Sequence, residues 1–271
     1  MLRNTVTFYL LFVLAAALAA PAQVTRQAAP DLHTIVERME QATQQNRENY
    51  RSYVITRHYS MIGEHDEKPS SQVTAEISFV PPRQKEFRIL QAVGSSRGEG
   101  IVRNILEHDV KATASGDSPG SVDRQNYDFT YAGEQVLDGN ACFLLSLQPK
   151  RKEKNLVVGR AWVDQKTFLI RRVQGTLAKS PSWWIKTVEV TLDFGSAGGM
   201  WLHTASKAVA DMRIFGPHTL TERALSIQAG STVAQVIAPD RFLQGTTSGS
   251  ASARPARKRP HPDAVLGAMQ H

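Results

Sequence analysis

The sequence predicts an α+β fold, mostly β, in which two amphipathic helices cover one antiparallel sheet. Four runs rich in β-branched and aromatic residues follow one another between residues 141 and 194, each bounded by Pro, Gly, Asp or Lys, as in a meander of consecutive strands. Two other stretches, 31–45 and 98–114, place apolar residues at helical spacing. A single long antiparallel sheet must curl, and a curled sheet that is loosely covered encloses apolar volume.

The first helix begins at Asp31, whose side chain can accept hydrogen bonds from the free amides of the first turn. Its apolar stripe consists of Leu32, Ile35, Val36, Met39 and Ala42. From Tyr53 the side-chain period changes to two, and three strands are predicted over 53–61, 73–79 and 85–93. The second helix then interrupts the sheet.

The remaining strands form the meander and its flanks. They are predicted over 127–131, 142–147, 156–164, 168–176, 184–194, 201–212 and 214–227. The run 156–164 is apolar on both faces, which predicts a central strand covered on both sides. In the run 184–194, apolar residues from Trp184 to Phe194 share one face, and Thr187, Glu189 and Asp193 belong to the other, which is therefore predicted to be wet.

Both ends of the chain differ from this body. Residues 1–22 combine a basic start, an apolar stretch and the small residues Ala20-Pro21-Ala22, the layout of a secretory signal peptide; an uncleaved membrane anchor is the alternative. Export with cleavage near Ala22 is expected. Residues 23–30 are predicted to be a linker, 31–243 one domain, and 244–271 a disordered basic tail with a charge of +3, suited to solubility or loose attraction to anionic surfaces.

The chemistry of the sequence indicates binding rather than catalysis. The formal net charge is +7, and the single cysteine, Cys142, excludes an internal disulfide and a cysteine-based metal site. We find no catalytic motif, no phosphate-binding glycine loop and no closely spaced histidine pair, so no catalytic residue, metal or cofactor is predicted. Aromatic residues recur on the predicted strands, as either a packed core or an apolar ligand cavity requires. The cavity candidates are Phe79, Phe87, Tyr127, Phe129, Trp162, Trp184 and Trp201.

Short strand and turn motifs resemble those of a known family. They are NYDF at 126–129, LQPKRK at 147–152, GRAWVD at 159–164, IRRVQG at 170–175 and GGMWL at 198–202. Together with the order helix, three strands, helix and long meander, they are similar to the outer-membrane lipoprotein-sorting family of LolA-like periplasmic proteins, in its envelope-protein branch. The resemblance covers roughly residues 31–228. It implies an incomplete, half-open β-barrel with helices as a lid over an apolar cavity for acyl chains.

The resemblance also implies a role. The chain is expected to be a periplasmic binding and carrier protein, a chaperone-like transporter of lipid or lipoprotein acyl chains in outer-membrane lipoprotein sorting. The alternative is a lipid-sensing regulatory module of envelope stress signalling, of the anti-sigma-factor partner type. Carriers of this family close their lid with an arginine near an early strand, for which Arg57 and Arg88 are the candidates.

Expected partners follow from the same role. They are an acyl chain, inner- and outer-membrane envelope proteins, and transiently an anionic membrane surface; nucleic acid is not among them, because export removes that partner. The basic turn formed by Lys150, Arg151, Lys152 and Lys154 is either a solvated turn that keeps a sheet edge soluble or a contact to anionic headgroups.

Overall fold

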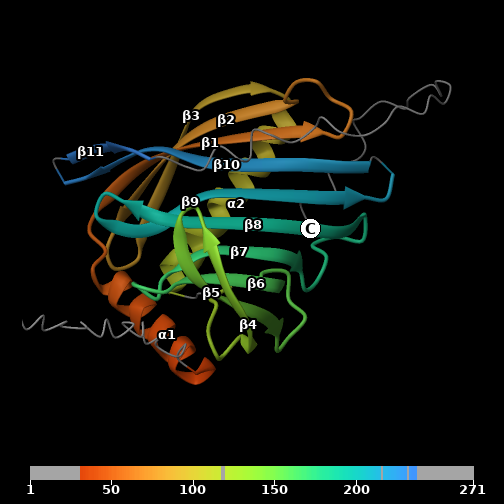
Figure 1. Ribbon diagram of the computed structural model, residues 1–271. Helices are drawn as coiled ribbons and strands as arrows, with labels where there is room; N and C mark the ends of the chain where they lie inside the picture. Colours follow the sequence, from red (N-terminus) through yellow and green to blue (C-terminus); the bar gives the residue numbers. More distant parts are fainter. Residues whose placement is uncertain (1–30, 117–119, 215, 231, 237–271) are drawn as a thin grey trace, which may run out of the picture. The chain divides into compact units, whose positions relative to one another are not determined.

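One antiparallel sheet runs through the part of the chain that the structure describes, in the order β3-β2-β1-β10-β9-β8-β7-β6-β5-β4 (Figure 1). This computed structural model describes residues 31–116, 120–214, 216–230 and 232–236. The strands are β1 (Tyr53–Gly63), β2 (Ser71–Val80), β3 (Gln84–Gly94), β4 (Tyr127–Leu137), β5 (Asn140–Pro149), β6 (Val157–Asp164), β7 (Ile170–Leu177), β8 (Ile185–Ala197), β9 (Met200–Met212), β10 (Gly216–Ala229) and β11 (Thr232–Gln235), and the helices are α1 (Leu32–Glu48) and α2 (Ser96–Ser115). The predicted signal segment, linker and basic tail lie outside the described residues.

The sheet is curved and open. Strands β3 and β4 occupy its two ends and do not pair with each other, so the curve stops short of a closed barrel. The predicted class, a mostly β fold with an incomplete antiparallel barrel and two covering helices, is confirmed. Figure 1 shows α2 crossing behind the strands and α1 beside β4 and β5.

Both helices begin at the residues that can cap them. The Asp31 side chain accepts a hydrogen bond from the Thr34 amide at 3.0 Å, as predicted, and Ser95 accepts one from the Arg97 amide at 3.3 Å. Helix α2 ends at Gly116, whose φ of +75° is the left-handed conformation that glycine adopts without strain. Each helix is therefore bounded by its local sequence.

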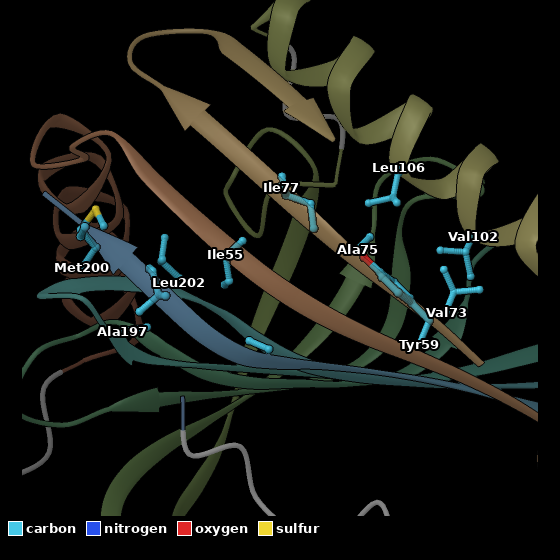
Figure 2. Packing of buried hydrophobic residues seen from close by; sticks show 13 residues of the cluster. Ile55, Tyr59, Val73, Ala75, Ile77, Val102, Leu106, Ala197, Met200 and Leu202 are labelled. Atoms are coloured by element: carbon cyan, nitrogen blue, oxygen red, sulfur yellow. The ribbon is translucent and has the colours of Figure 1, made fainter. Parts of the chain in front are cut away.

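Both helices cover the inner face of the sheet through few side chains. Helix α1 packs Ile35, Val36 and Met39 against β5 and β6, where Phe143, Leu145 and Val163 are buried with them. In α2, only Gly98, Val102 and Leu106 are buried. Figure 2 shows Val102 and Leu106 pointing toward Val73, Ala75 and Tyr59 on β1 and β2.

The last strands depart from the predicted pattern. Strand β10 pairs with β9 only as far as Arg223 opposite Ala205, and the short β11, which the sequence did not predict, pairs with β10 beyond that point. The end of the β8–β9 hairpin that contains the turn is therefore not hydrogen-bonded to β10 as part of the sheet. Its residues Met200 and Leu202 belong to the same buried cluster as Ile55 and Ile227 (Figure 2 shows the first three).

Two sequence expectations about sheet faces are wrong. Strand β6 is interior, but its outer face is covered only in part, because Val158 is 44% exposed whereas Trp162 on the same face is 9% exposed. Asp193 was placed on a wet face, yet it is 3% exposed and accepts a hydrogen bond from Arg172 Nε at 2.6 Å. The neighbouring strand supplies this partner, which period-two alternation along one strand cannot reveal.

Candidate functional site

The inner face of β1 carries one charged residue among apolar ones. Tyr53, Ile55, Arg57 and Tyr59 alternate onto the same side of the strand, and Ile55 and Tyr59 are buried in the cluster that includes Val102 and Leu106 of α2. Arg57 therefore projects into the space that α2 covers. A buried charge in this position requires partners.

Arg57 finds its partners on two other strands. Its Nη1 donates to Oε1 of Glu222 on β10 and lies 3.2 Å from Nδ1 of His203 on β9, while its Nη2 donates to the His203 carbonyl at 2.9 Å. Ser206 Oγ donates to Glu222 Oε2 at 3.0 Å. We call Arg57, His203, Ser206 and Glu222 the polar cluster.

Two β-bulges bring the polar cluster together. One lies between Thr56 and Arg57 in the pairing of β1 with β10, and the other lies where β8 and β9 pass from Asp193 to Phe194. The second bulge places Phe194 opposite His203, with 5.5 Å between their ring centroids. Bulges re-aim side chains in this way next to functional sites.

The polar cluster is strongly coupled. Burial tends to raise the pKa of Glu222, but the charge of Arg57 and the hydrogen bonds from Ser206 and Arg57 outweigh it, and the pKa of Glu222 lies below its ordinary value of 4.5. Burial lowers the pKa of His203 below 6.5, assisted by Arg57. At neutral pH the cluster is thus an arginine–glutamate ion pair beside a neutral imidazole. The Nε2 atom of His203 is buried without a hydrogen-bond partner among the described residues.

Aromatic side chains lie on the same inner face as the polar cluster. The ring of Phe79 lies 6.0 Å from that of Tyr50 and 5.3 Å from that of Tyr53, and Phe87 packs on the buried cluster beside them. Burial raises the pKa of Tyr53 to about 12, so its hydroxyl stays protonated. The face combines a large apolar area with a few fixed polar groups, the usual make-up of a ligand site.

Besides its three buried residues, helix α2 has an ion pair with the sheet within the part of the chain that the structure describes. Lys85 Nζ on β3 lies 3.0 Å from both carboxylate oxygens of Asp109. Asp109 is half exposed, so this pair contributes little net stability. The helix covers this face through a small contact, in which Val102 and Leu106 join the buried cluster.

The predicted ligand residues fall into two groups. Phe79, Phe87 and Arg57 lie on the inner face near α2. Tyr127 and Phe129 also lie on this face, in the clusters of β4 to β7 next to α1, and Trp201 is held at the end of α1, where Asn46 bonds both its amide and its carbonyl.

The structure separates three predicted residues from this face. Trp162 belongs to the outer-face cluster of Cys142 and Leu144, and its Nε1 donates to Gln135 at 3.0 Å. Trp184 precedes β8 and stacks on Trp183, with 3.6 Å between ring centroids. Arg88 lies on the outside and pairs with Glu76 at 3.0 Å.

Sequence reasoning missed most of the polar cluster. Arg57 was among the candidates, whereas His203, Ser206 and Glu222 were not singled out. One signal was present: Glu222 lies in a strand whose alternate residues Leu220 and Ala224 are apolar, so a charge on that face called for a partner.

The described residues contain neither a metal-binding cluster nor a helix suited to span a membrane. No group of three or more His, Cys, Asp or Glu side chains there is arranged to hold a metal ion. No described helix has the length and apolar character needed to cross a membrane.

Comparisons with known proteins give similarity in structure alone. No family model and no curated protein matches the sequence. A DUF1329 family protein from Desulfovibrio piger is 11% identical over 80% of this chain and 98% of that chain, with a TM-score of 0.39. A putative outer-membrane lipoprotein-sorting protein domain from Vibrio parahaemolyticus is 11% identical over 74% and 94%, with a TM-score of 0.41. A LolA superfamily protein from Nitrosomonas europaea is 11% identical over 80% and 99%, with a TM-score of 0.37.

These matches are proteins of the kind that the sequence motifs resemble. The open antiparallel sheet and the two covering helices that the motif resemblance implies are those described above. An identity of 11% transfers neither ligand nor partner.

Proposed function

We propose that the protein is a periplasmic carrier that holds an acyl chain of a lipid or lipoprotein on the inner face of the sheet, beneath α2, and serves outer-membrane lipoprotein sorting without performing chemistry. The composition of the inner face supports this proposal. It is apolar and aromatic around a fixed polar cluster, and its cover is attached through few side chains.

The energetics favour displacement of α2 by a chain. Exposing Val102 and Leu106 costs about 1.5–3 kcal/mol each. Each methylene that a chain buries contributes about 0.8 kcal/mol, so roughly six methylenes offset the loss of the helix contact. A long acyl chain has more than enough, and the curved sheet supplies the surface.

The polar cluster can fix the position of the bound chain and of α2 relative to the sheet. Arg57, which the family resemblance suggested as the lid-closing residue, projects toward α2 but is neutralised by Glu222 on the sheet. The unpartnered Nε2–H of His203 is a donor that a ligand carbonyl can use. A bound acyl group with an ester or amide carbonyl would satisfy it.

Contact with an anionic membrane is part of the proposal. Trp183 is 69% exposed and Ile214 is 62% exposed, and the two loops that carry them touch, since Arg213 donates to the Trp183 and Trp184 carbonyls. An exposed tryptophan beside basic residues suits a membrane–water interface. Trp183→Ala is expected to weaken cosedimentation with anionic vesicles; unchanged binding would remove the membrane contact from the proposal.

Binding of palmitate tests the carrier proposal. Titration followed by native mass spectrometry should show one or more palmitates on the intact protein. Leu106→Ala weakens the contact of α2 with the sheet and should strengthen palmitate binding, because a helix that opens more readily reduces the cost of entry. The matched control is Leu144→Ala, an equally buried leucine on the outer face. Absence of palmitate binding in all three proteins would refute the carrier function.

A further inference from the structure

A hollow lies between α2 and two loops at one end of the sheet. Its volume is about 460 Å³, within the range of small-molecule sites. His108 of α2 forms one wall, the β5–β6 loop supplies Lys152 to Asn155, and the β7–β8 loop supplies Lys179. The hollow therefore joins the cover helix to the rim of the sheet.

The hollow is electropositive. Lys152, Lys154 and Lys179 are exposed and form no ion pair with any carboxylate among the described residues. The acidic side chain in the lining, Glu153, is engaged by Arg151, whose Nε lies 2.9 Å from Glu153 Oε1. Three uncompensated ammonium groups around one concave space attract an anion.

One buried group in the lining lacks a partner. Asn155 Nδ2 is buried and makes no hydrogen bond to any residue that the structure describes. A buried donor in this state is unfavourable until an acceptor reaches it. An anionic oxygen in the hollow would neutralise the lysines, and one that reaches Asn155 Nδ2 would also satisfy this donor.

We propose that this hollow binds the phosphate of an anionic acyl lipid, with the acyl chain directed beneath α2. The inference rests on the proposed carrier function and specifies its cargo. Val102 and Leu106 of α2 lie on the sheet, whereas His108 of the same helix lines the hollow. Because His108 is two positions from Leu106, it faces away from the buried stripe, and in the proposed complex the acyl chain passes around the side of the helix from the hollow to the face that Val102 and Leu106 cover.

Two palmitoyl lipids, one with a phosphate headgroup and one without, test the inference, and palmitate serves as the reference for chain binding. The protein should bind palmitoyl-lysophosphatidylglycerol about tenfold or more tightly than monopalmitoylglycerol at low salt, and added salt should reduce that difference. Equal affinity for the two lipids would overturn the headgroup site and leave the carrier function intact. Failure of both lipids and of palmitate to bind would overturn the carrier function.

Substitutions of the lysines test whether the preference for the anionic lipid arises in the hollow. Lys152→Gln/Lys154→Gln/Lys179→Gln should remove the preference for the anionic lipid while leaving monopalmitoylglycerol binding unchanged. The control, Lys68→Gln/Lys166→Gln/Lys207→Gln, makes the same change in net charge away from the hollow and should retain the preference. Equal loss in both triple variants would assign the preference to net charge and overturn the site.

Two further measurements use Asn155→Ala, which removes the buried donor, and glycerol 3-phosphate, an anion without an acyl chain. The substitution should weaken lysophosphatidylglycerol binding several-fold with no effect on monopalmitoylglycerol; an unchanged affinity would overturn the role of the Asn155 donor. Glycerol 3-phosphate, which carries the phosphate without a chain, should bind far more weakly than the lysolipid. If it binds equally tightly, the hollow takes a free phosphate compound, and the inference of a lipid headgroup is wrong.

Discussion

At the scale of single residues, the polar cluster is the most unusual feature of the molecule. Arg57, His203 and Glu222 come from three strands and are mostly buried on a face that is otherwise apolar. Buried ion pairs seldom add net stability, because desolvation of both charges cancels the attraction. Removing one member is costly, however, because it leaves the other charge without a partner.

Arg57→Ala should therefore destabilise the protein by about 3–5 kcal/mol. Arg57→Met with Glu222→Leu should cost much less, since no unpaired charge remains in the double variant. The matched control is Arg88→Ala, which breaks an exposed pair with Glu76 and should cost at most about 1 kcal/mol. Urea unfolding midpoints measure all three; a similar loss for Arg57→Ala and Arg88→Ala would show that the cluster is not effectively buried.

Stability should fall on acidification. The pKa of His203 in the folded state lies below its ordinary value of 6.5. As the pH falls below 6.5, the unfolded chain is therefore protonated before the folded protein is, and the free energy of unfolding decreases until the pH reaches the pKa of the folded state. Glu222, with a pKa below 4.5, adds a second loss at lower pH, below its unfolded value. His58, whose pKa burial also lowers, contributes in the same direction as His203.

His203→Gln should reduce the slope of unfolding free energy against pH just below pH 6.5 and leave the more acidic loss in place. The unsubstituted protein is the reference. The comparison requires urea titrations at several pH values. An unaltered slope in His203→Gln would assign the acid sensitivity to another group.

At the scale of elements, α2 is seated by a close contact near its start. A Cβ on Gly98 would lie 2.3 Å from Met61 Cε and from Ser71 Cβ and Oγ, whereas a Cβ on Gly100 would meet nothing within 4 Å. The two glycines lie in the same first turns of one helix. Only the first therefore holds the helix close to the sheet.

Substitution of the two glycines by alanine should change the free energy of unfolding in opposite directions. Gly98→Ala should destabilise the protein by about 1–3 kcal/mol, because α2 must shift to accommodate the methyl group. Gly100→Ala should stabilise it by about 0.5–1 kcal/mol through helix propensity. Thermal or urea unfolding measures the difference. Equal effects of the two substitutions would contradict the seating of α2 on β1 and β2.

Most elements could be predicted from local sequence, because each strand carries its own alternation and each helix its own cap. Asp31 marks the start of α1, and the runs from Tyr53 onward become strands close to the predicted bounds. Trp184 was assigned to a strand because it shares the period of β8. Its chain instead turns between Ser182 and Ile185, and the ring stacks on Trp183.

At the scale of the whole molecule, contacts between distant strands could not be predicted. Arg57 and Glu222 are 165 residues apart and meet because β10 returns to pair with β1, which no local pattern encodes. The same holds for Trp162, whose side of the sheet depends on the register of β5 and β6. The family resemblance supplied the open-barrel architecture that alternation alone left undetermined.

The central claim is that an acyl chain lies on the inner face of the sheet beneath α2. A palmitate analogue with a photoreactive diazirine near its methyl end tests this most directly, through mass-spectrometric mapping of the crosslinked peptides. The account predicts adducts on β1, β2 and β10, around Ile55, Tyr59 and Leu220, and on the buried side of α2. Adducts confined to the outer face, around Leu144 and Trp162, would contradict it.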